Sequence, residues 1–165
     1  MSQAKRHYEA SISVAALPAQ VFAYTDDHAS FSSHMNKSSW MMGGGRMEVV
    51  LDEGRGQKVG SHIRMHGRVL GLSLSLHEVV MRRDPPRAKT WETVGTPRLL
   101  VVGDYRMGFE IRPQGTSATL RVFIDYDLPA KNAWLGRLFG KMYAQWCVRQ
   151  MIGGVHTHFG AGVGQ

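Results

Sequence analysis

The sequence predicts an α+β fold, in which an antiparallel sheet of about seven strands packs against one long C-terminal helix. Three observations lead to this prediction. One strand pattern lies near the N-terminus, about six more follow from Arg46 onward through short connections, and a helical pattern ends the chain. Strands joined by hairpin-length turns pair antiparallel, and their shared apolar face needs a helix to cover it.

The first strand pattern is the segment HYEASISVA, in which every second residue is apolar or aromatic: Tyr8, Ala10, Ile12 and Val14. Such alternation predicts a half-buried strand. Pro18 then suits the first turn of a helix, and we expect a short helix from Pro18 to about Asp26. The next segment, HASFSSHMNKSS, is polar and is read as a second short helix followed by a loop. One or two short helices are therefore expected after the first strand.

Strand patterns dominate from Arg46 to Leu128. The apolar series that define them are Met47, Val49 and Leu51; Val59, Ile63 and Met65; Leu70, Leu72, Leu74 and Leu76; Leu99, Val101, Tyr105, Met107, Phe109 and Ile111; and Ala118, Leu120, Val122, Ile124 and Tyr126. Turns are expected at EGRGQ and PQGT, and the DPPR segment interrupts the sheet because prolines do not fit a central strand. AKTWETV resumes the sheet after that break.

The final helix, from about residue 132, is rich in aromatic side chains. On a helical wheel its apolar residues fall within an arc of about 140°, and they are Leu135, Leu138, Phe139, Met142, Tyr143 and Trp146. Arg137, Lys141 and Gln145 lie on the other side. Trp and Phe opposite Lys and Arg are also typical of a helix that lies on a membrane surface. We prefer a core helix or a pocket wall, because the predicted sheet has no other long helix to cover it.

Length and composition limit the classes of protein that fit. At 165 residues the chain is long enough for one core, and we expect residues 1–165 to form a single domain with a flexible Gly-rich tail from about residue 154. Cys147 is the only cysteine, so an internal disulfide is excluded. The first residues lack the apolar stretch of a secretory signal, and no run of about 18 uncharged apolar residues is present. We therefore expect a cytoplasmic protein.

The charge balance is basic: 20 Lys and Arg against 13 Asp and Glu give a formal net charge of +7. This excess would suit RNA or an anionic membrane surface. However, the basic residues are scattered singly and in pairs, which favours a solvated basic surface. We expect no DNA partner, and RNA or an anionic membrane surface stays open as a partner.

Two segments resemble a known superfamily. The segment ISVAALPAQVFAYTDD resembles the opening of the START-like, helix-grip (SRPBCC) superfamily, which includes the polyketide cyclase/dehydrase and lipid transport proteins. The segment DLPAKNAWLGRLFGKMYAQWCVRQMI is similar to the superfamily's final strand and long helix. The order of the elements between them also matches, so the resemblance covers essentially the whole chain. It implies a curved sheet that grips the C-terminal helix, with a deep and mostly apolar cavity between them.

The resemblance also suggests which residues line that cavity. We expect these to be Tyr24, Tyr105, Met107, Phe109, Leu138, Met142, Tyr143 and Trp146. Which of them reach open space rather than pack in the core is left open. The resemblance implies no particular reaction, because the superfamily includes carriers, receptors and cyclases, and the catalytic residues are unknown.

No metal site or cofactor is expected. His62 and His66 share one strand face but lie roughly 13 Å apart, which is too far for one metal ion. The GGGR segment at Gly43–Arg46 lacks the following helix and Lys-Ser/Thr of a phosphate-binding loop. We interpret it as a loop at the cavity mouth, beside Trp40, Met41 and Met42.

Three hypotheses of function follow. The first is a carrier or sensor that holds an apolar or amphipathic small molecule between sheet and helix, and it requires a cavity of about 300 Å³ or more. The second is a polyketide cyclase/dehydratase-like enzyme that uses acid–base chemistry, and it requires at least two polar side chains converging in the pocket. The third is a basic interaction module for RNA, the ribosome or an anionic membrane. The sequence identifies neither the ligand nor the oligomeric state.

Overall fold

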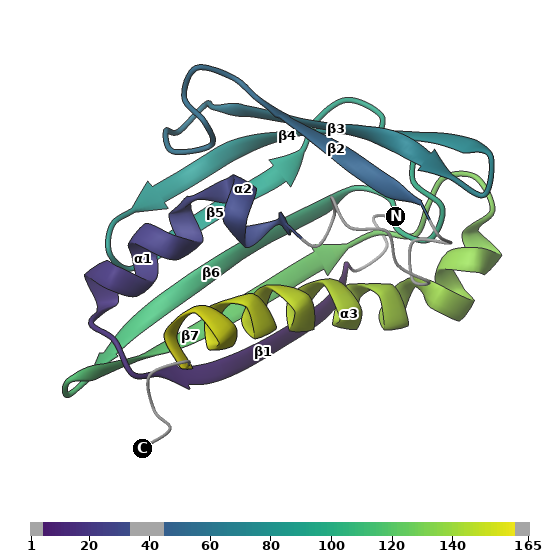
Figure 1. Ribbon diagram of the computed structural model, residues 1–165. Coiled ribbons are helices and arrows are strands. Elements are labelled where there is room, and N and C mark those ends of the chain that lie inside the picture. The colour runs from purple at the N-terminus through teal and green to yellow at the C-terminus, as the bar shows by residue number, and fades with distance from the viewer. Residues whose placement is uncertain (1–4, 34–44, 161–165) are drawn as a thin grey trace.

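The computed structural model describes residues 5–33 and 45–160, and its strands form one curved sheet around a long helix (Figure 1). In chain order the elements are β1 (Arg6–Val14), α1 (Pro18–Asp26), α2 (His28–Phe31), β2 (Arg46–Leu51), β3 (His62–Val69), β4 (Leu72–Asp84), β5 (Ala88–Thr93), β6 (Tyr105–Gln114), β7 (Ser117–Tyr126) and α3 (Ala133–Gly160). The seven strands pair antiparallel in the order β1-β7-β6-β5-β4-β3-β2. The predicted α+β, helix-grip fold is confirmed.

The two short helices lie on the same side of the sheet as α3 (Figure 1). Helix α1 begins at Pro18 as predicted, and the Gln20 side chain accepts a hydrogen bond of 3.0 Å from the Leu17 backbone N–H. This contact satisfies a backbone N–H group at the start of the helix. Val21 and Phe22 of α1 are buried against the sheet.

An ion cluster around the buried Asp26 fixes the end of α1 to the sheet. The Asp26 carboxylate lies 2.8 Å from Arg83 Nη2 of β4 and 3.1 Å from Lys89 Nζ of β5. Lys89 is fully buried and also donates a hydrogen bond of 3.1 Å to the Asp26 carbonyl oxygen. Burial raises the pKa of Asp26, but Arg83 and Lys89 outweigh it and the net pKa is lowered. The cluster ties the end of α1, next to α2, to β4 and β5.

The strand expected from Leu99 begins only at Tyr105. Residues 99–104 form a connection instead, with Arg98 bridged to Ser75 of β4 through two backbone hydrogen bonds. Gly103 lies so close to the chain after β7 that a Cβ atom there would be 2.6 Å from the Leu128 carbonyl oxygen. The apolar residues of this connection therefore pack over the end of the sheet, where Val102 is buried.

The face of α3 that packs inward differs from the predicted one. Its buried residues are Gly136, Gly140, Ala144, Cys147, Val148, Met151, Ile152 and Val155. A Cβ atom would lie 2.5 Å from Pro129 Cδ at Gly136 and 2.8 Å from the Val101 carbonyl oxygen at Gly140. The first half of the helix thus packs through glycine against the chain around Val101. Leu138, Phe139 and Met142 are turned outward, about half a helical turn from where the wheel placed them.

The helix also extends further than predicted. The flexible Gly-rich tail was expected from about residue 154, but α3 continues to Gly160. Val155 is buried, and the Phe159 ring lies 5.9 Å from that of Tyr24 on α1, so apolar contacts stabilise these last turns. The loop predicted around Trp40, Met41 and Met42 lies outside the described residues.

Candidate functional site

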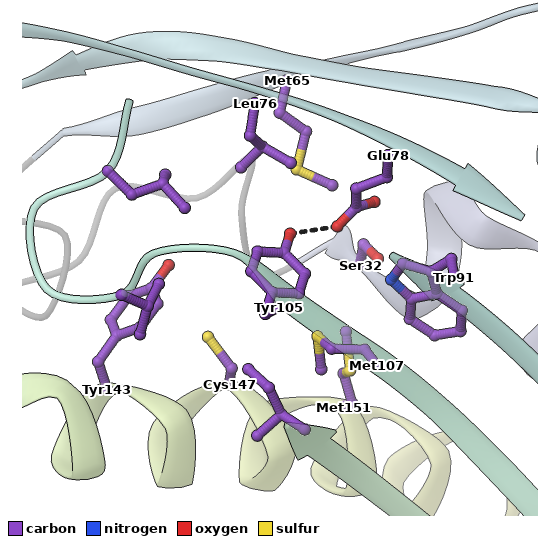
Figure 2. Close-up of a pocket in the computed structure, with 13 residues that line it drawn as sticks. Ser32, Met65, Leu76, Glu78, Trp91, Tyr105, Met107, Tyr143, Cys147 and Met151 are labelled. Atoms are coloured by element: carbon purple, nitrogen blue, oxygen red, sulfur yellow. Dashed lines mark hydrogen bonds between the residues drawn. The ribbon is translucent and has the colours of Figure 1, made fainter. Parts of the chain in front are cut away.

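A small cavity lies between the concave face of the sheet and α3 (Figure 2). Its volume is about 30 Å³, which is room for about one water molecule. The residues that line it are Ser32, Met65, Leu76, Glu78, Trp91, Leu99, Val102, Tyr105, Met107, Ile124, Tyr143, Cys147 and Met151. Most of these side chains are apolar, so the few polar groups determine what chemistry the cavity can perform.

Strand register brings two of those polar groups together. Glu78 of β4 pairs with Thr93 of β5. Thr93 in turn lies opposite Tyr105 of β6, one step beyond the Glu92–Arg106 pair, and its Oγ1 accepts a 3.1 Å hydrogen bond from the Tyr105 backbone N–H. Cross-strand neighbours project on the same face of a sheet, so Glu78 and Tyr105 both point to the concave side. There the Tyr105 hydroxyl donates a hydrogen bond to Glu78 Oε1, drawn as the dashed line in Figure 2.

Helix α2 adds a second polar contact to the same carboxyl group. His28 Nε2 lies 3.7 Å from Glu78 Oε2 and 3.2 Å from Ser32 Oγ. The His28 ring meets the Trp91 ring edge-on at 5.2 Å between centroids. His28 and Glu78 are each 1% exposed. The arrangement is a buried row of polar groups, Ser32–His28–Glu78–Tyr105, enclosed by apolar side chains.

Burial governs the acidity of these groups. It raises the pKa of Glu78 to about 7, although the Tyr105 hydrogen bond and Lys89 act in the opposite direction. Burial, followed by the nearby Glu78 carboxyl, raises the pKa of Tyr105 well above its usual value. Burial likewise raises the pKa of Tyr143 well above its usual value, and that of Cys147 to about 12. At neutral pH the phenols and the thiol are therefore protonated donors, and Glu78 alone among these four titrates nearby.

A carboxyl group with a pKa near 7 is suited to proton transfer, because both of its protonation states are populated at neutral pH. The Tyr105 hydroxyl holds Oε1 and fixes the orientation of the carboxyl group. Oε2 makes no hydrogen bond to another described residue, although it is buried at the cavity. A hydroxyl or amine group placed in the cavity could therefore donate a hydrogen bond to Oε2.

Three of the residues predicted to line a cavity do line this one: Tyr105, Met107 and Tyr143. Phe109 is fully buried beside the rings of Phe22, Phe31 and Trp91. It belongs to the solid core.

The remaining predicted residues lie elsewhere. Leu138 and Met142 are 64% and 43% exposed, and Trp146 is half-buried with its ring 5.8 Å from that of Tyr143. Tyr24 stacks on His158 at 4.3 Å and lines an open surface cleft of about 550 Å³ between α1 and α3. Leu138, Met142 and Trp146 lie outside the cavity because the glycine face of α3 points inward.

Glu78 and His28 were missed by the sequence analysis. Glu78 follows Leu72, Leu74 and Leu76 at the same alternation and precedes Val80, so a carboxylate occupies an inward position in an apolar series. That interruption is a signal that the sequence carries. His28 has no such signal, because only the tertiary placement of α2 brings it to the cavity.

No cluster of three or more metal-ligating side chains is found among residues 5–33 and 45–160. His62 and His66 lie on the exposed outer face, and His62 Nδ1 lies 2.6 Å from Nε2 of His77 on β4. Burial, together with His62 and Arg64, lowers the pKa of His77. None of the helices in these residues combines the length and the hydropathy that a transmembrane span needs.

The cavity has a volume of about 30 Å³, which is well below the size of about 300 Å³ that the carrier hypothesis requires. Its walls contain Met65, Met107 and Met151, whose unbranched side chains adopt many rotamers. The requirement of the enzyme hypothesis is met, because Glu78 and Tyr105 converge at the cavity.

Several proteins of known structure share the fold of this chain. A protein from Thermus thermophilus, TTHA0849, has a TM-score of 0.68 at 15% identity, covering 96% of this chain and 100% of that one. Norcoclaurine synthase from Thalictrum flavum, in complex with dopamine and hydroxybenzaldehyde, has a TM-score of 0.65 at 14% identity, covering 98% and 90%. The Zhui aromatase/cyclase from Streptomyces sp. R1128 has a TM-score of 0.62 at 16% identity, covering 98% and 99%. At these identities the likeness shows the fold alone.

A search of curated proteins finds no match to this chain. The family model described as polyketide cyclase / dehydrase and lipid transport matches residues 5–156. That match spans every strand and α3 up to His156, and it agrees with the helix-grip arrangement of sheet and helix. The chain belongs to the polyketide cyclase/dehydrase and lipid transport family.

Proposed function

We propose that this chain binds a small, largely apolar molecule between the sheet and α3, with a hydroxyl or amine group of that molecule at Glu78. The observation that carries the proposal is the buried Oε2 atom of Glu78, a residue that lines the cavity. Oε2 makes no hydrogen bond to another described residue, and its ion-pair contact with His28 is 3.7 Å long. Buried polar atoms are nearly always hydrogen-bonded, and an unsatisfied one costs about 1–3 kcal/mol. A donor group on a ligand would recover that cost.

Binding of anything larger than water requires the cavity to widen. Met65, Met107 and Met151 surround it on three elements, and a change of rotamer in a thioether side chain costs little. The ion cluster at Asp26 holds α1 to β4 and β5, so widening is expected on the side of α3 and the connection before β6. The family and the cyclase and synthase folds similar to this one support a small-molecule ligand. A cytoplasmic location is part of the same proposal.

Denaturing extraction of freshly purified protein, followed by mass spectrometry, tests this binding. We expect one largely apolar species with a hydroxyl or amine group at near-stoichiometric yield from the native sequence, and a markedly lower yield from Glu78→Gln. Glu92→Gln is the matched control, because Glu92 lies on the neighbouring strand with the opposite alternation. Equal yields from all three proteins, or no species together with no saturable binding of anilinonaphthalene sulfonate, would contradict the proposal.

A second candidate function is acid–base catalysis on the bound molecule, of the cyclase or dehydratase kind. It is favoured by the pKa of about 7 at Glu78 and by the hydrogen bond from Tyr105. Glu78 would accept a proton from the substrate and return it to the intermediate, while Tyr105 holds the carboxyl group in position.

Incubation of the extracted molecule in D₂O with the protein tests the catalytic role. We expect turnover or deuterium incorporation that falls on the acid side of a pH near the pKa of Glu78. Glu78→Gln should abolish the exchange, whereas Tyr105→Phe should shift its pH profile while the protein stays folded. Binding without exchange or turnover at any pH would leave the binding proposal intact and remove the catalytic one.

A further inference from the structure

The first half of α3 presents large apolar side chains to solvent. Trp134 and Leu138 are 61% and 64% exposed, Met142 is 43% exposed and Phe139 is 38% exposed. Trp134, Leu138 and Met142 are spaced four residues apart, so they form one row along the helix, which we call the outer row. Single exposed apolar residues are ordinary, whereas neighbouring ones that form a patch point to an interaction site.

The packing of α3 fixes the outer row in this orientation. Gly136 and Gly140 contact the chain around Val101 so closely that no side chain fits there. Rotating the helix to bury Trp134 would bring a larger residue into that contact. The exposure is therefore a consequence of the fold.

Basic residues flank the outer row, and α3 itself carries no acidic residue. Lys131, Arg137 and Lys141 are exposed, and none of the 28 residues of α3 is Asp or Glu. Cations near a helix N-terminus oppose the helix dipole, where acidic residues would stabilise it. The basic residues at this end of α3 therefore do not stabilise the isolated helix. They are instead placed to contact an anionic binding partner.

We propose that the outer row, together with Lys131, Arg137 and Lys141, docks the chain on a membrane surface that contains anionic lipids. The Trp, Leu and Met side chains of the outer row enter the region between headgroups and acyl chains, and the flanking Lys and Arg contact the lipid phosphates. The proposal does not depend on the ligand or on catalysis at Glu78. It assigns a role to the aromatic residues of α3 that the cavity does not use.

Two other occupants fit the surface less well. A second copy packed about a two-fold axis would place Arg137 and Lys141 near the same residues of its partner, with no acidic residue of α3 to neutralise them. RNA would pair its phosphates with the basic side chains, but the apolar side chains of Leu138 and Met142 would then face a charged backbone. Both occupants are distinguished by the experiment.

Co-sedimentation with vesicles tests the proposal. We expect the protein to bind vesicles of phosphatidylcholine with phosphatidylglycerol at least tenfold more tightly than phosphatidylcholine alone. The variant Trp134→Ser/Leu138→Ser/Met142→Ser should weaken binding to the mixed vesicles tenfold or more, and Arg137→Gln/Lys141→Gln should do the same. Lys58→Gln/Val59→Ser is the matched control, since it removes one exposed cation and one exposed apolar side chain from the connection between β2 and β3. Circular dichroism checks that each variant keeps its fold.

Each alternative result overturns the proposal in a different way. Equal sedimentation with and without vesicles removes membrane docking. Binding to polyuridylate that the Arg137→Gln/Lys141→Gln variant loses, with no effect of the serine variant on vesicles, assigns the surface to RNA. Light scattering that shows a dimer for the native chain and a monomer for the serine variant assigns it to a second copy.

Discussion

The Tyr105 hydroxyl donates a hydrogen bond to the Glu78 carboxyl group across the intervening strand β5, at the cavity between sheet and helix. Both residues are almost fully enclosed, and the carboxyl group has a pKa of about 7 in the folded protein. A carboxyl group shifted this far alters the stability of the protein as well as its chemistry.

Glu78→Gln is expected to change how stability depends on pH. The folded pKa of Glu78 is raised from 4.5 to about 7, so between these values the folded state holds a proton that the unfolded state has released. The free energy of unfolding of the native sequence therefore falls as pH rises through this window, by about 3 kcal/mol from this group. Urea unfolding at pH 4.5 and pH 8 measures the loss, and the variant should lack it. The same pH dependence in both proteins would contradict the assignment.

Gly140→Ala is expected to destabilise the protein although alanine favours helices. The new Cβ atom would lie 2.8 Å from the Val101 carbonyl oxygen, so backbone must move. We expect a loss of about 1–3 kcal/mol in the free energy of unfolding. Gly153→Ala on the same helix is the control, because nothing lies within 4 Å of its Cβ position. It should stabilise by up to about 1 kcal/mol, and equal effects of the two changes would argue against the close packing at Gly140.

Asp26→Asn is expected to destabilise the protein strongly. It leaves the buried Lys89 ammonium without its carboxylate partner, a change that typically costs about 3–5 kcal/mol. Asp84→Asn is the comparison, because its pairs with Arg82 and Arg87 are largely exposed and worth about 1 kcal/mol or less. Thermal unfolding of both variants measures the difference. A loss at Asp26 no larger than that at Asp84 would show that the cluster does not hold α1.

Cys147 is expected to resist alkylation in the folded protein. Burial raises the pKa of its thiol to about 12, so almost no thiolate is present at neutral pH. Iodoacetamide labelling, followed by mass spectrometry, should be complete within minutes in guanidinium and slower by orders of magnitude without it. Rapid labelling of the native protein would show that the cavity opens readily beside α3.

The sheet was predictable because its strands alternate clearly and its turns carry glycine and proline. The limits of α1 followed from Pro18 and the apolar residues after it. The connection at residues 99–104 was taken for strand, since its apolar side chains pack over the sheet end and leave no local mark of a loop.

The predicted inward face of α3 was wrong, because the helical wheel assigns large apolar side chains to the buried face and gives no weight to glycine. Gly136, Gly140 and Ala144 repeat every four residues, and this spacing indicates close backbone packing as plainly as large residues indicate burial. Tyr143 lies at the edge of both faces and so reaches the cavity. Glu78 was detectable from its inward alternation, whereas its contact with His28 depends on how α2 sits on the sheet, which no local pattern encodes.

The pairing of β1 with β7 determines when this chain can fold during its synthesis. β1 pairs along its whole length, from Arg6 opposite Tyr126 to Val14 opposite Ala118, with residues made more than 100 positions later. Until β7 leaves the ribosome, β1 has no neighbour in the sheet and its backbone groups are open to other chains. Such distant pairing also slows folding in general. Synthesis must therefore reach β7 before the sheet that β1 begins can be completed.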